Sequence, residues 1–267
     1  MAKSSTWICG VAVLMVAAPL SFGQGMPPHD ISGTWTPARE GAGIGGGGPF
    51  SMPSDGKHEP PYTAAAREKM APYRPGNGMY QVAPPLINDP AVIYCDPQGV
   101  PRIDLYELRD THITHEKEKT FIMYQYDHTW REIWTDGREL PKNPEPRWMG
   151  YSVGKWDGDN AFVATTNGVD GRTWLDKTGR PHSEAMVVEE RWERVKPDLL
   201  EFTVTINDPT MYTAAWKPLN KFQMKLLPAS SEPIEMMCSV SEYMIYNRHM
   251  KFGNPTAGTG GQKPPEQ

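Results

Sequence analysis

The sequence predicts an all-β protein, an antiparallel meander of about nine or ten strands that closes into a barrel. The first observation behind this is alternation of apolar and polar residues in many short segments after residue 110, which is typical of strands with one buried face. The second is a set of tight turns between these segments, such as Asp157-Gly158-Asp159. Closure would remove the exposed edges of the meander, which favours a barrel over the alternative, a β-sandwich.

The N-terminal residues 1–24 have the layout of a secretory signal peptide. Lys3 supplies the positive charge, residues 8–20 the apolar stretch, and Ser21-Phe22-Gly23 a small-residue cleavage region. The apolar stretch is too short to span a bilayer comfortably. We therefore expect a periplasmic or secreted protein that has no membrane partner after cleavage.

Charge and length limit the classes of partner and the number of domains. The formal net charge is −5 and the chain has no basic run, which argues against nucleic-acid binding. We expect a Gly/Pro-rich N-terminal arm over 25–94, one barrel domain over 95–252, and a disordered tail over 253–267. The oligomeric state has no signal in the sequence.

The N-terminal arm is predicted to contain a first strand over residues 31–36, followed by a flexible Gly/Pro-rich stretch over 37–61. Gly41, Gly43 and Gly46 in that stretch formally satisfy a GxGxxG motif. No strand leads directly into the motif and no amphipathic helix follows it closely, so we predict no dinucleotide site.

One helix is predicted, over residues 62–70, with Thr63 as its N-cap and Pro72 beyond its end. The later strand candidates, in chain order, are residues 111–116, 119–126, 129–135, 148–156, 160–167, 183–195, 199–206, 221–227 and 235–243. The first strand carries Gly33-Thr34-Trp35, a Gly-x-Trp pattern that also opens lipocalin-type barrels. Together with the meander, this pattern favours a calycin-like or lipocalin-like barrel with one short helix.

Two cysteines, Cys95 and Cys238, remain after signal cleavage. In an oxidising compartment they most simply form one disulfide that closes a loop of about 140 residues. Two buried free thiols are the alternative. Because the chain has no CxxC motif or Cys/His cluster, this pair is not expected to bind a metal.

Strand parity groups tryptophans with glutamates. Trp130, Glu132 and Trp134 share one strand face, and Glu190 shares a face with Trp192. If these faces point inward, Glu132 and Glu190 are carboxyl groups in apolar surroundings, with a raised pKa suited to general acid or base chemistry. The alternative is that the faces point outward, or that an arginine neutralises each glutamate.

A second polar group is predicted at one mouth of the barrel. Asp170, Trp174, Asp176, His182 and Glu184 are close in sequence around a turn. A histidine held by a carboxylate beside an aromatic ring is a plausible acid–base pair. A network of hydrogen bonds that fixes the loop is the structural alternative.

Metal and covalent chemistry have little support. His112 and His115 are three residues apart, which places them on opposite faces of a strand. His128 would have to join His182 to complete a three-ligand site, and no GxSxG motif is present. We expect no metal and no other cofactor.

Several motifs resemble those of an uncharacterised family of secreted bacterial proteins found in acidobacteria and proteobacteria. The matching segments, beginning with Ser32-Gly33-Thr34-Trp35, are CDPQGVPR at 95–102, WTDGR at 134–138, GYSVGKWDGD at 150–159, TWLD at 173–176, GRPHS at 179–183, ERW at 190–192 and NDP at 207–209. The resemblance covers most of the chain beyond residue 90 and implies export and a fold-sized unit. The family also carries a late cysteine, which corresponds to Cys238 and supports the disulfide.

The sequence departs from the family pattern at three places. Leu140 stands where a histidine is usual, Ala164 where an acidic residue is usual, and Ser239-Val240-Ser241 where Asn-Glu-Asn is usual. If these positions belong to an ancestral site, this chain has changed it.

Three functional hypotheses follow. The first is a barrel that binds a small, mostly apolar or aromatic molecule. Its stacking residues would be Trp130, Trp134, Tyr151, Trp174 and Trp192, and its orienting polar groups Glu132, Glu190 and His182.

The second hypothesis is a cofactor-independent lyase, hydratase or isomerase in the same cavity. His182 would act as acid or base, Asp176 would orient it, and Glu190 would be the partner acid. The third is a protein-interaction module that uses the Pro-rich N-terminal arm.

Overall fold

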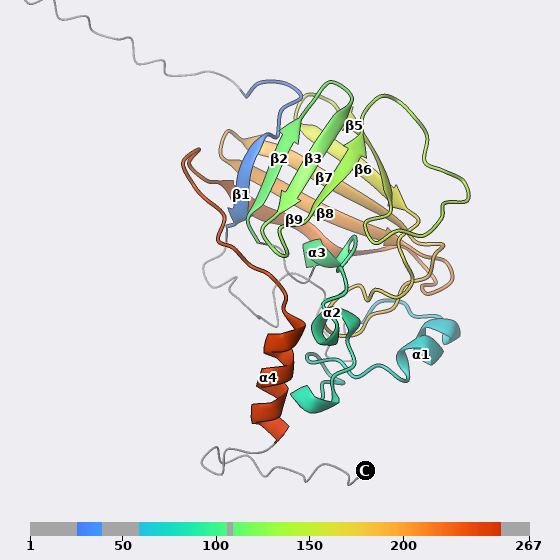
Figure 1. The fold of residues 1–267 in the computed structure, drawn as a ribbon. Helices are drawn as coiled ribbons and strands as arrows, with labels where there is room; N and C mark the ends of the chain where they lie inside the picture. The colour runs from blue at the N-terminus through green and yellow to red at the C-terminus, as the bar shows by residue number, and fades with distance from the viewer. Residues whose placement is uncertain (1–25, 39–58, 106–108, 252–267) are drawn as a thin grey trace, which may run out of the picture.

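A computed structural model describes residues 26–38, 59–105 and 109–251. The described chain forms a closed barrel of nine strands that follow one another around the barrel in chain order, which confirms the predicted architecture (Figure 1). The strands are β1 (Gly33–Pro37), β2 (Thr111–His115), β3 (Lys119–Tyr124), β4 (Trp130–Trp134), β5 (Tyr151–Asp157), β6 (Ala161–Asn167), β7 (Val187–Lys196), β8 (Leu199–Asn207) and β9 (Trp216–Leu226).

Eight of the nine strand contacts are antiparallel, and the contact of β4 with β5 is parallel. The β4–β5 ladder has a single register pair, Trp134 with Val153, whereas β5 and β6 pair from Tyr151–Asn167 to Asp157–Ala161. Closure is made by β1, which pairs with both β2 and β9. The β4–β5 contact is therefore the least bonded line in the barrel wall.

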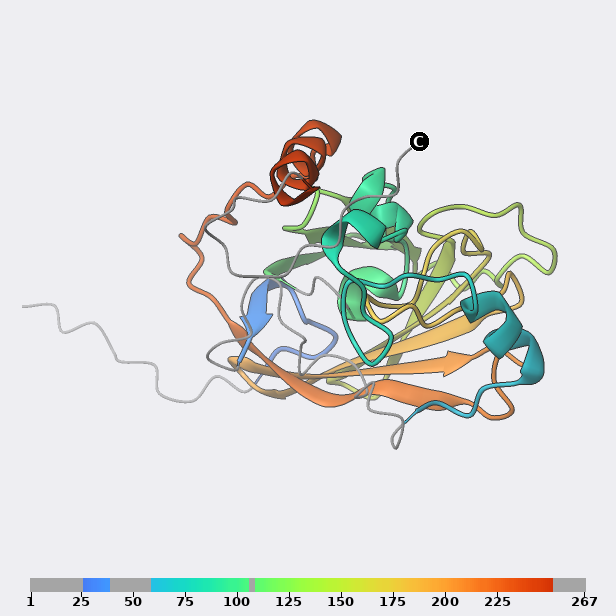
Figure 2. The same cartoon turned by 90° about the horizontal axis from the view of Figure 1, so that it is seen from below.

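Short helices gather at one end of the barrel (Figure 1). They are α1 (Ala64–Met70), the 3₁₀ helix η1 (Pro84–Leu86), α2 (Pro90–Ile93), α3 (Arg102–Leu105) and α4 (Val240–Lys251). Helix α1 confirms the predicted helix, and its first turn is capped by Thr63, whose Oγ1 accepts a hydrogen bond from the Ala66 amide at 3.1 Å. Seen from below, α3 lies across the barrel opening (Figure 2).

The predicted strand at 235–243 is wrong. Only Met236 forms a bridge there, with Tyr126, and the chain then enters α4, where Ser239 Oγ accepts from the Glu242 amide at 3.4 Å. The pairing of β1 with β9 already closes the barrel, so no free edge remains for a tenth strand. In addition, β9 begins at Trp216, earlier than the predicted start at residue 221.

The disulfide between Cys95 and Cys238 is present, with Cα atoms 5.6 Å apart and a sequence separation of 143 residues. It joins the segment that precedes α3 to the segment that precedes α4. The predicted signal peptide, the Gly41–Gly46 motif and the tail at 253–267 lie outside the described residues. No helix among the described residues is long and apolar enough to cross a bilayer.

Alternate residues of the strands fill the barrel interior. Phe162, Trp192 and Phe202 are almost completely buried, and the Trp192 and Phe202 rings stack with centroids 4.9 Å apart. Gly154 makes room for this packing, because a Cβ there would collide with the Phe162 ring and lie 2.8 Å from Ile133 Cγ2. At the end opposite the helices, the His29 ring stacks on Trp156 at 5.1 Å.

Candidate functional site

The face of β4 that carries Trp130, Glu132 and Trp134 points outward, so the prediction that these three residues line the interior is wrong. Trp130 is 55% exposed, and Glu132 accepts from Lys119 Nζ at 2.9 Å across the outer surface. Trp134 is flanked by Lys119 Nζ at 4.0 Å and by Arg138 Cζ at 3.4 Å from the ring centroid. Such cation–π contacts stabilise an aromatic ring on a solvent-exposed face. The tryptophans of β4 therefore did not identify the face of the strand that points into the barrel.

The opposite face of β4 brings Arg131 into the interior. Its Nη2 donates to Glu190 Oε1 at 2.6 Å, and neither side chain is more than 2% exposed. Strands β5 and β6 lie between β4 and β7 in the wall, so this ion pair reaches across the inside of the barrel. Glu190 and Trp192 point inward, as the sequence predicts. Arg131 pairs with Glu190, which is the structural alternative that the sequence analysis left open.

Asp104 of α3 and Tyr124 of β3 complete the group that we call the interior cluster: Asp104, Tyr124, Arg131 and Glu190. None of the four is more than 4% exposed. Burial, reinforced by the neighbouring Glu190, raises the pKa of Asp104 well above its ordinary value. Burial likewise raises the pKa of Tyr124.

Arg131 holds its charge inside the barrel because of its neighbours. Burial disfavours the guanidinium charge, but Glu190, followed by Tyr124 and Asp104, outweighs burial and raises the pKa of Arg131. The cluster therefore combines one ion pair with two groups whose raised pKa favours the neutral form, the Asp104 carboxyl and the Tyr124 phenol.

Five polar atoms of the interior cluster have no hydrogen-bond partner among the described residues. They are Asp104 Oδ2, Tyr124 Oη, Arg131 Nε, Arg131 Nη1 and Glu190 Oε2. Buried polar atoms are paired in the great majority of native structures. An unpaired set concentrated at one place indicates a position for a small polar group or for ordered water.

An aromatic wall adjoins the cluster. Arg131 Cζ lies 5.8 Å from the Trp192 ring centroid, and Trp192 is stacked on Phe202 and lies 6.1 Å from Phe162. Of the residues predicted to bind ligand by stacking, Trp192 is the one that the structure places here. A groove of about 260 Å³ lies elsewhere, among Ala38 and residues 218–223 at β9.

His182 is buried outside the interior cluster and does not form the predicted pair with Asp176. Its Nε2 lies 2.6 Å from Thr173 Oγ1 and its Nδ1 lies 3.1 Å from the Ser183 carbonyl oxygen. Burial lowers the pKa of His182 to about 4. The ring is therefore neutral at pH 7, with Nδ1–H donating to Ser183 and Nε2 accepting from Thr173.

Asp176 is held by other partners. It accepts from Arg180 Nη1 at 2.6 Å and from the Thr178 amide and hydroxyl at 2.8 Å and 2.7 Å. Burial opposes its charge, but Arg180 and Thr178 prevail and lower its pKa. The role predicted for Asp176, orienting His182, is therefore wrong, and both residues fix the loop at 173–183.

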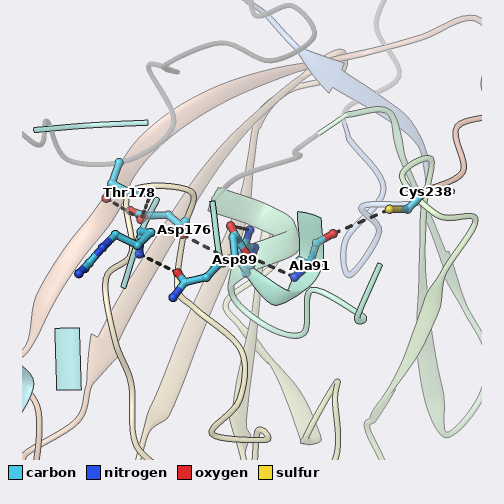
Figure 3. Close-up of polar contacts among 8 residues, drawn as sticks. Asp89, Ala91, Asp176, Thr178 and Cys238 are labelled. Carbon is cyan, nitrogen blue, oxygen red and sulfur yellow. Dashed lines mark hydrogen bonds and ion pairs between the residues drawn. The ribbon is translucent and has the colours of Figure 1, made fainter. Parts of the chain in front are cut away.

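The same loop anchors α3 through Arg102, whose Nη2 donates to Asp89 Oδ2 at 2.6 Å and whose Nη1 lies 3.5 Å from the Asp176 carbonyl oxygen. Asp89 Oδ1 accepts from the Ala91 amide at 3.1 Å, and Cys238 Sγ lies 3.8 Å from the Ala91 carbonyl oxygen. Figure 3 shows this chain of contacts running from Thr178 to Cys238. The network places α3, and with it Asp104, at the mouth of the barrel.

The two remaining aromatic candidates lie apart from the interior cluster. Trp174 packs in the loop against Tyr73, with ring centroids 4.4 Å apart. Tyr151 is half-buried beneath Arg147, whose Cζ lies 4.2 Å from the ring.

Sequence reasoning missed Asp104, Tyr124 and Arg131. Arg131 lies two residues from Ile133 and Tyr124 two residues from Ile122, so each shares a strand face with an isoleucine. This shared face was the available signal. Asp104 had no comparable signal, because its position depends on a four-residue helix held by distant contacts.

No group of three or more His, Cys, Asp or Glu side chains is placed to hold a metal within residues 26–38, 59–105 and 109–251. His112 instead lies 2.9 Å from Thr34 Oγ1, and His115 Nδ1 lies 2.8 Å from Thr120 Oγ1.

Comparisons of the chain with family models, with curated proteins and with solved structures found no match.

Proposed function

We propose that the protein is an exported β-barrel protein that binds a small, mostly apolar or aromatic molecule inside the barrel, at the interior cluster. The observation that carries the proposal is the set of five unpaired polar atoms around the Arg131–Glu190 ion pair, next to the wall formed by Trp192 and Phe202. Ligand sites commonly combine an apolar wall with a few convergent polar groups.

The unpaired atoms of the interior cluster carry a free-energy cost. Each buried donor or acceptor without a partner costs about 1–3 kcal/mol. A ligand head group that pairs with several of them recovers part of this cost, so the cluster favours a polar group of matching shape. The aromatic wall then supplies dispersion and stacking for the rest of the molecule.

Entry is expected at the α3 end of the barrel. Helix α3 lies across the opening (Figure 2) and brings Asp104 to the cluster. It is four residues long and is anchored by Arg102, so its displacement would disrupt few backbone hydrogen bonds. Loss of the Arg102–Asp89 ion pair should therefore speed ligand exchange.

Binding is tested by calorimetric titration with four one-ring aromatic probes: phenol, benzamide, acetophenone and benzoate. The blocking variant is Ala164→Leu, because Ala164 pairs with Glu190 in the β6–β7 register and is fully buried. The control is Thr165→Leu, the neighbouring residue on the other face of β6. We expect saturable binding of at least one probe, weakened at least about tenfold by Ala164→Leu and less than about twofold by Thr165→Leu.

The blocking variant needs a check on folding, because overpacking a core often destabilises it. Circular dichroism of both variants provides this check. Absence of saturable binding of every probe by the wild-type protein would sink the proposal.

An acid–base enzyme in the same place is the second candidate, and one observation favours it. The pKa of Asp104 is raised, and the neighbouring Glu190 forms an ion pair with Arg131; two carboxyl groups in unlike environments are an arrangement that acid–base enzymes use. His182 and Asp176 take no part in this version.

The enzyme version predicts that the protein catalyses exchange of the acetophenone methyl protons with solvent deuterium, followed by nuclear magnetic resonance. Asp104→Asn should abolish the exchange and leave binding within about threefold. No exchange above the buffer rate, with acetophenone bound, would leave the binding protein as the function.

A further inference from the structure

We infer that the interior cluster recognises an uncharged head group that both donates and accepts hydrogen bonds, such as a carboxamide, and discriminates against carboxylates and ammonium groups. This inference rests on the proposed function and specifies the chemical class of ligand for the same site.

The first step is charge balance within the barrel. The positive charge of Arg131 is matched by Glu190 at 2.6 Å, and burial favours the uncharged forms of Asp104 and Tyr124. A ligand carboxylate or ammonium group would add an unbalanced charge to the buried interior, and such a charge is strongly disfavoured. An uncharged group leaves the balance intact.

The unpaired atoms of the cluster include both hydrogen-bond donors and acceptors. Arg131 Nε and Nη1 are donors that need an acceptor, and Glu190 Oε2 is an acceptor that needs a donor. A carboxamide oxygen can accept from the guanidinium while its NH₂ group donates to the carboxylate. A carboxylate only accepts and an ammonium group only donates, so each would leave part of the cluster unpaired.

The third step is discrimination. A site built to hydrogen-bond a polar head group rejects an analogue that leaves buried groups unpaired more strongly than an apolar pocket rejects a change of size. Preference for the amide over its charged isosteres should therefore be large, although the aromatic ring is the same in each probe.

The test compares benzamide, benzoate and benzylammonium by calorimetric titration at pH 7.5. For the wild-type protein, we expect benzamide to bind at least about tenfold more tightly than either ion. In Asp104→Asn/Glu190→Gln, Arg131 loses both neighbouring carboxyl groups that could balance its charge, so the order should reverse and benzoate should bind more tightly than benzamide. The control, Glu132→Gln on the outer face of β4, should keep the wild-type order.

Glu190→Gln leaves a buried arginine without its partner and is at risk of unfolding. The double variant Arg131→Gln/Glu190→Gln removes both charges together and gives a second test. It should bind benzamide in preference to benzoate and benzylammonium, as the wild type does, because the interior stays neutral.

The outcomes separate the two proposals. Wild-type binding of benzoate or benzylammonium at least as tightly as benzamide overturns the inference but supports the barrel interior as a binding site. Failure of all three probes to bind, while phenol and acetophenone also fail, overturns the proposed function itself. An Asp104→Asn/Glu190→Gln variant that is folded and keeps the wild-type order also overturns the inference.

Discussion

Arg131 and Glu190 balance each other's charge inside the barrel. Both side chains are almost fully buried and are joined at 2.6 Å. Removing one partner of such a pair leaves a bare charge in the interior, whereas replacing both with apolar residues is frequently neutral or stabilising. The pair is therefore a weak source of stability and a strong constraint on what else can enter.

This dependence predicts the stability of substituted proteins. Glu190→Gln should lower the free energy of unfolding by about 3–5 kcal/mol, because Arg131 is left uncompensated. Arg131→Met/Glu190→Met should recover most of that loss. Urea denaturation measures both, and Glu132→Gln, in the half-buried surface pair with Lys119, should change the free energy by less than about 1 kcal/mol.

His182 gives a pH-dependent prediction. Burial lowers its pKa to about 4 from an ordinary value of 6.5, so between these values the unfolded chain takes up a proton that the folded protein does not. Its contribution to stability is complete above pH 6.5 and is lost as the pH falls towards 4, by about 3 kcal/mol.

The measurement is the free energy of unfolding at several pH values between 4 and 7. His182→Gln should show a flatter dependence than the wild type over this window, and His249→Gln on the exposed side of α4 should match the wild type. Equal slopes for His182→Gln and wild type would contradict the low pKa.

At the residue scale, sequence patterns placed Glu190 and Trp192 correctly and placed Glu132, Trp130 and Trp134 on the wrong side. Both strands show the same alternation of tryptophan and glutamate. What distinguishes them is the partner of each glutamate: Lys119 pairs with Glu132 on the outside of β4, whereas Arg131 reaches Glu190 across the interior. These partners come from other strands or from across a turn, so parity within one strand cannot reveal them.

At the scale of single elements, alternation and turn chemistry predicted eight of the nine strands to within a few residues, and β9 with a late start. The exception was the segment after Cys238, where a short apolar run was read as a strand but forms α4. Apolar runs of this length do not distinguish strand from helix, and the decision here depended on the sheet having no free edge. The short helices α2 and α3 are held by Asp89 and Arg102, contacts that no local pattern shows.

Gly154 supports a prediction about how β4, β5 and β6 pack. Gly154→Ala should lower the free energy of unfolding by about 1–3 kcal/mol, because the new methyl group would meet Phe162 and Ile133. Gly171→Ala is the matched control, since a Cβ there has its nearest neighbour at 3.6 Å and the backbone φ is negative or extended. Thermal denaturation of the two variants measures the difference, and equal stability would show that the barrel wall expands without cost.

At the scale of the whole molecule, the disulfide connects the segment that precedes α3 to the segment that precedes α4. It spans 143 residues, and a bond across so long a loop removes much of the conformational freedom of the unfolded chain. The double variant Cys95→Ala/Cys238→Ala should lose about 2–5 kcal/mol of stability.

Urea denaturation under non-reducing conditions measures this loss. The wild-type protein with added reductant should move to the same midpoint as the double variant, and the double variant should not respond to reductant. A double variant as stable as the oxidised wild type would show that the helices hold their places without the bond.

The parallel contact of β4 with β5 affects where the barrel wall can open transiently. A ring with an odd number of strands cannot alternate direction all the way around, and here the mismatch falls next to Arg131, where Trp134 and Val153 make the single register pair. Transient separation along this line would open a slit in the side of the barrel, leading straight to the guanidinium, while β7, β8 and β9 stay joined. Backbone amides of β4 and β5 that face the slit should then exchange with deuterated water earlier than those of β7 and β8. A ligand would have this lateral route of entry in addition to the barrel opening beneath α3.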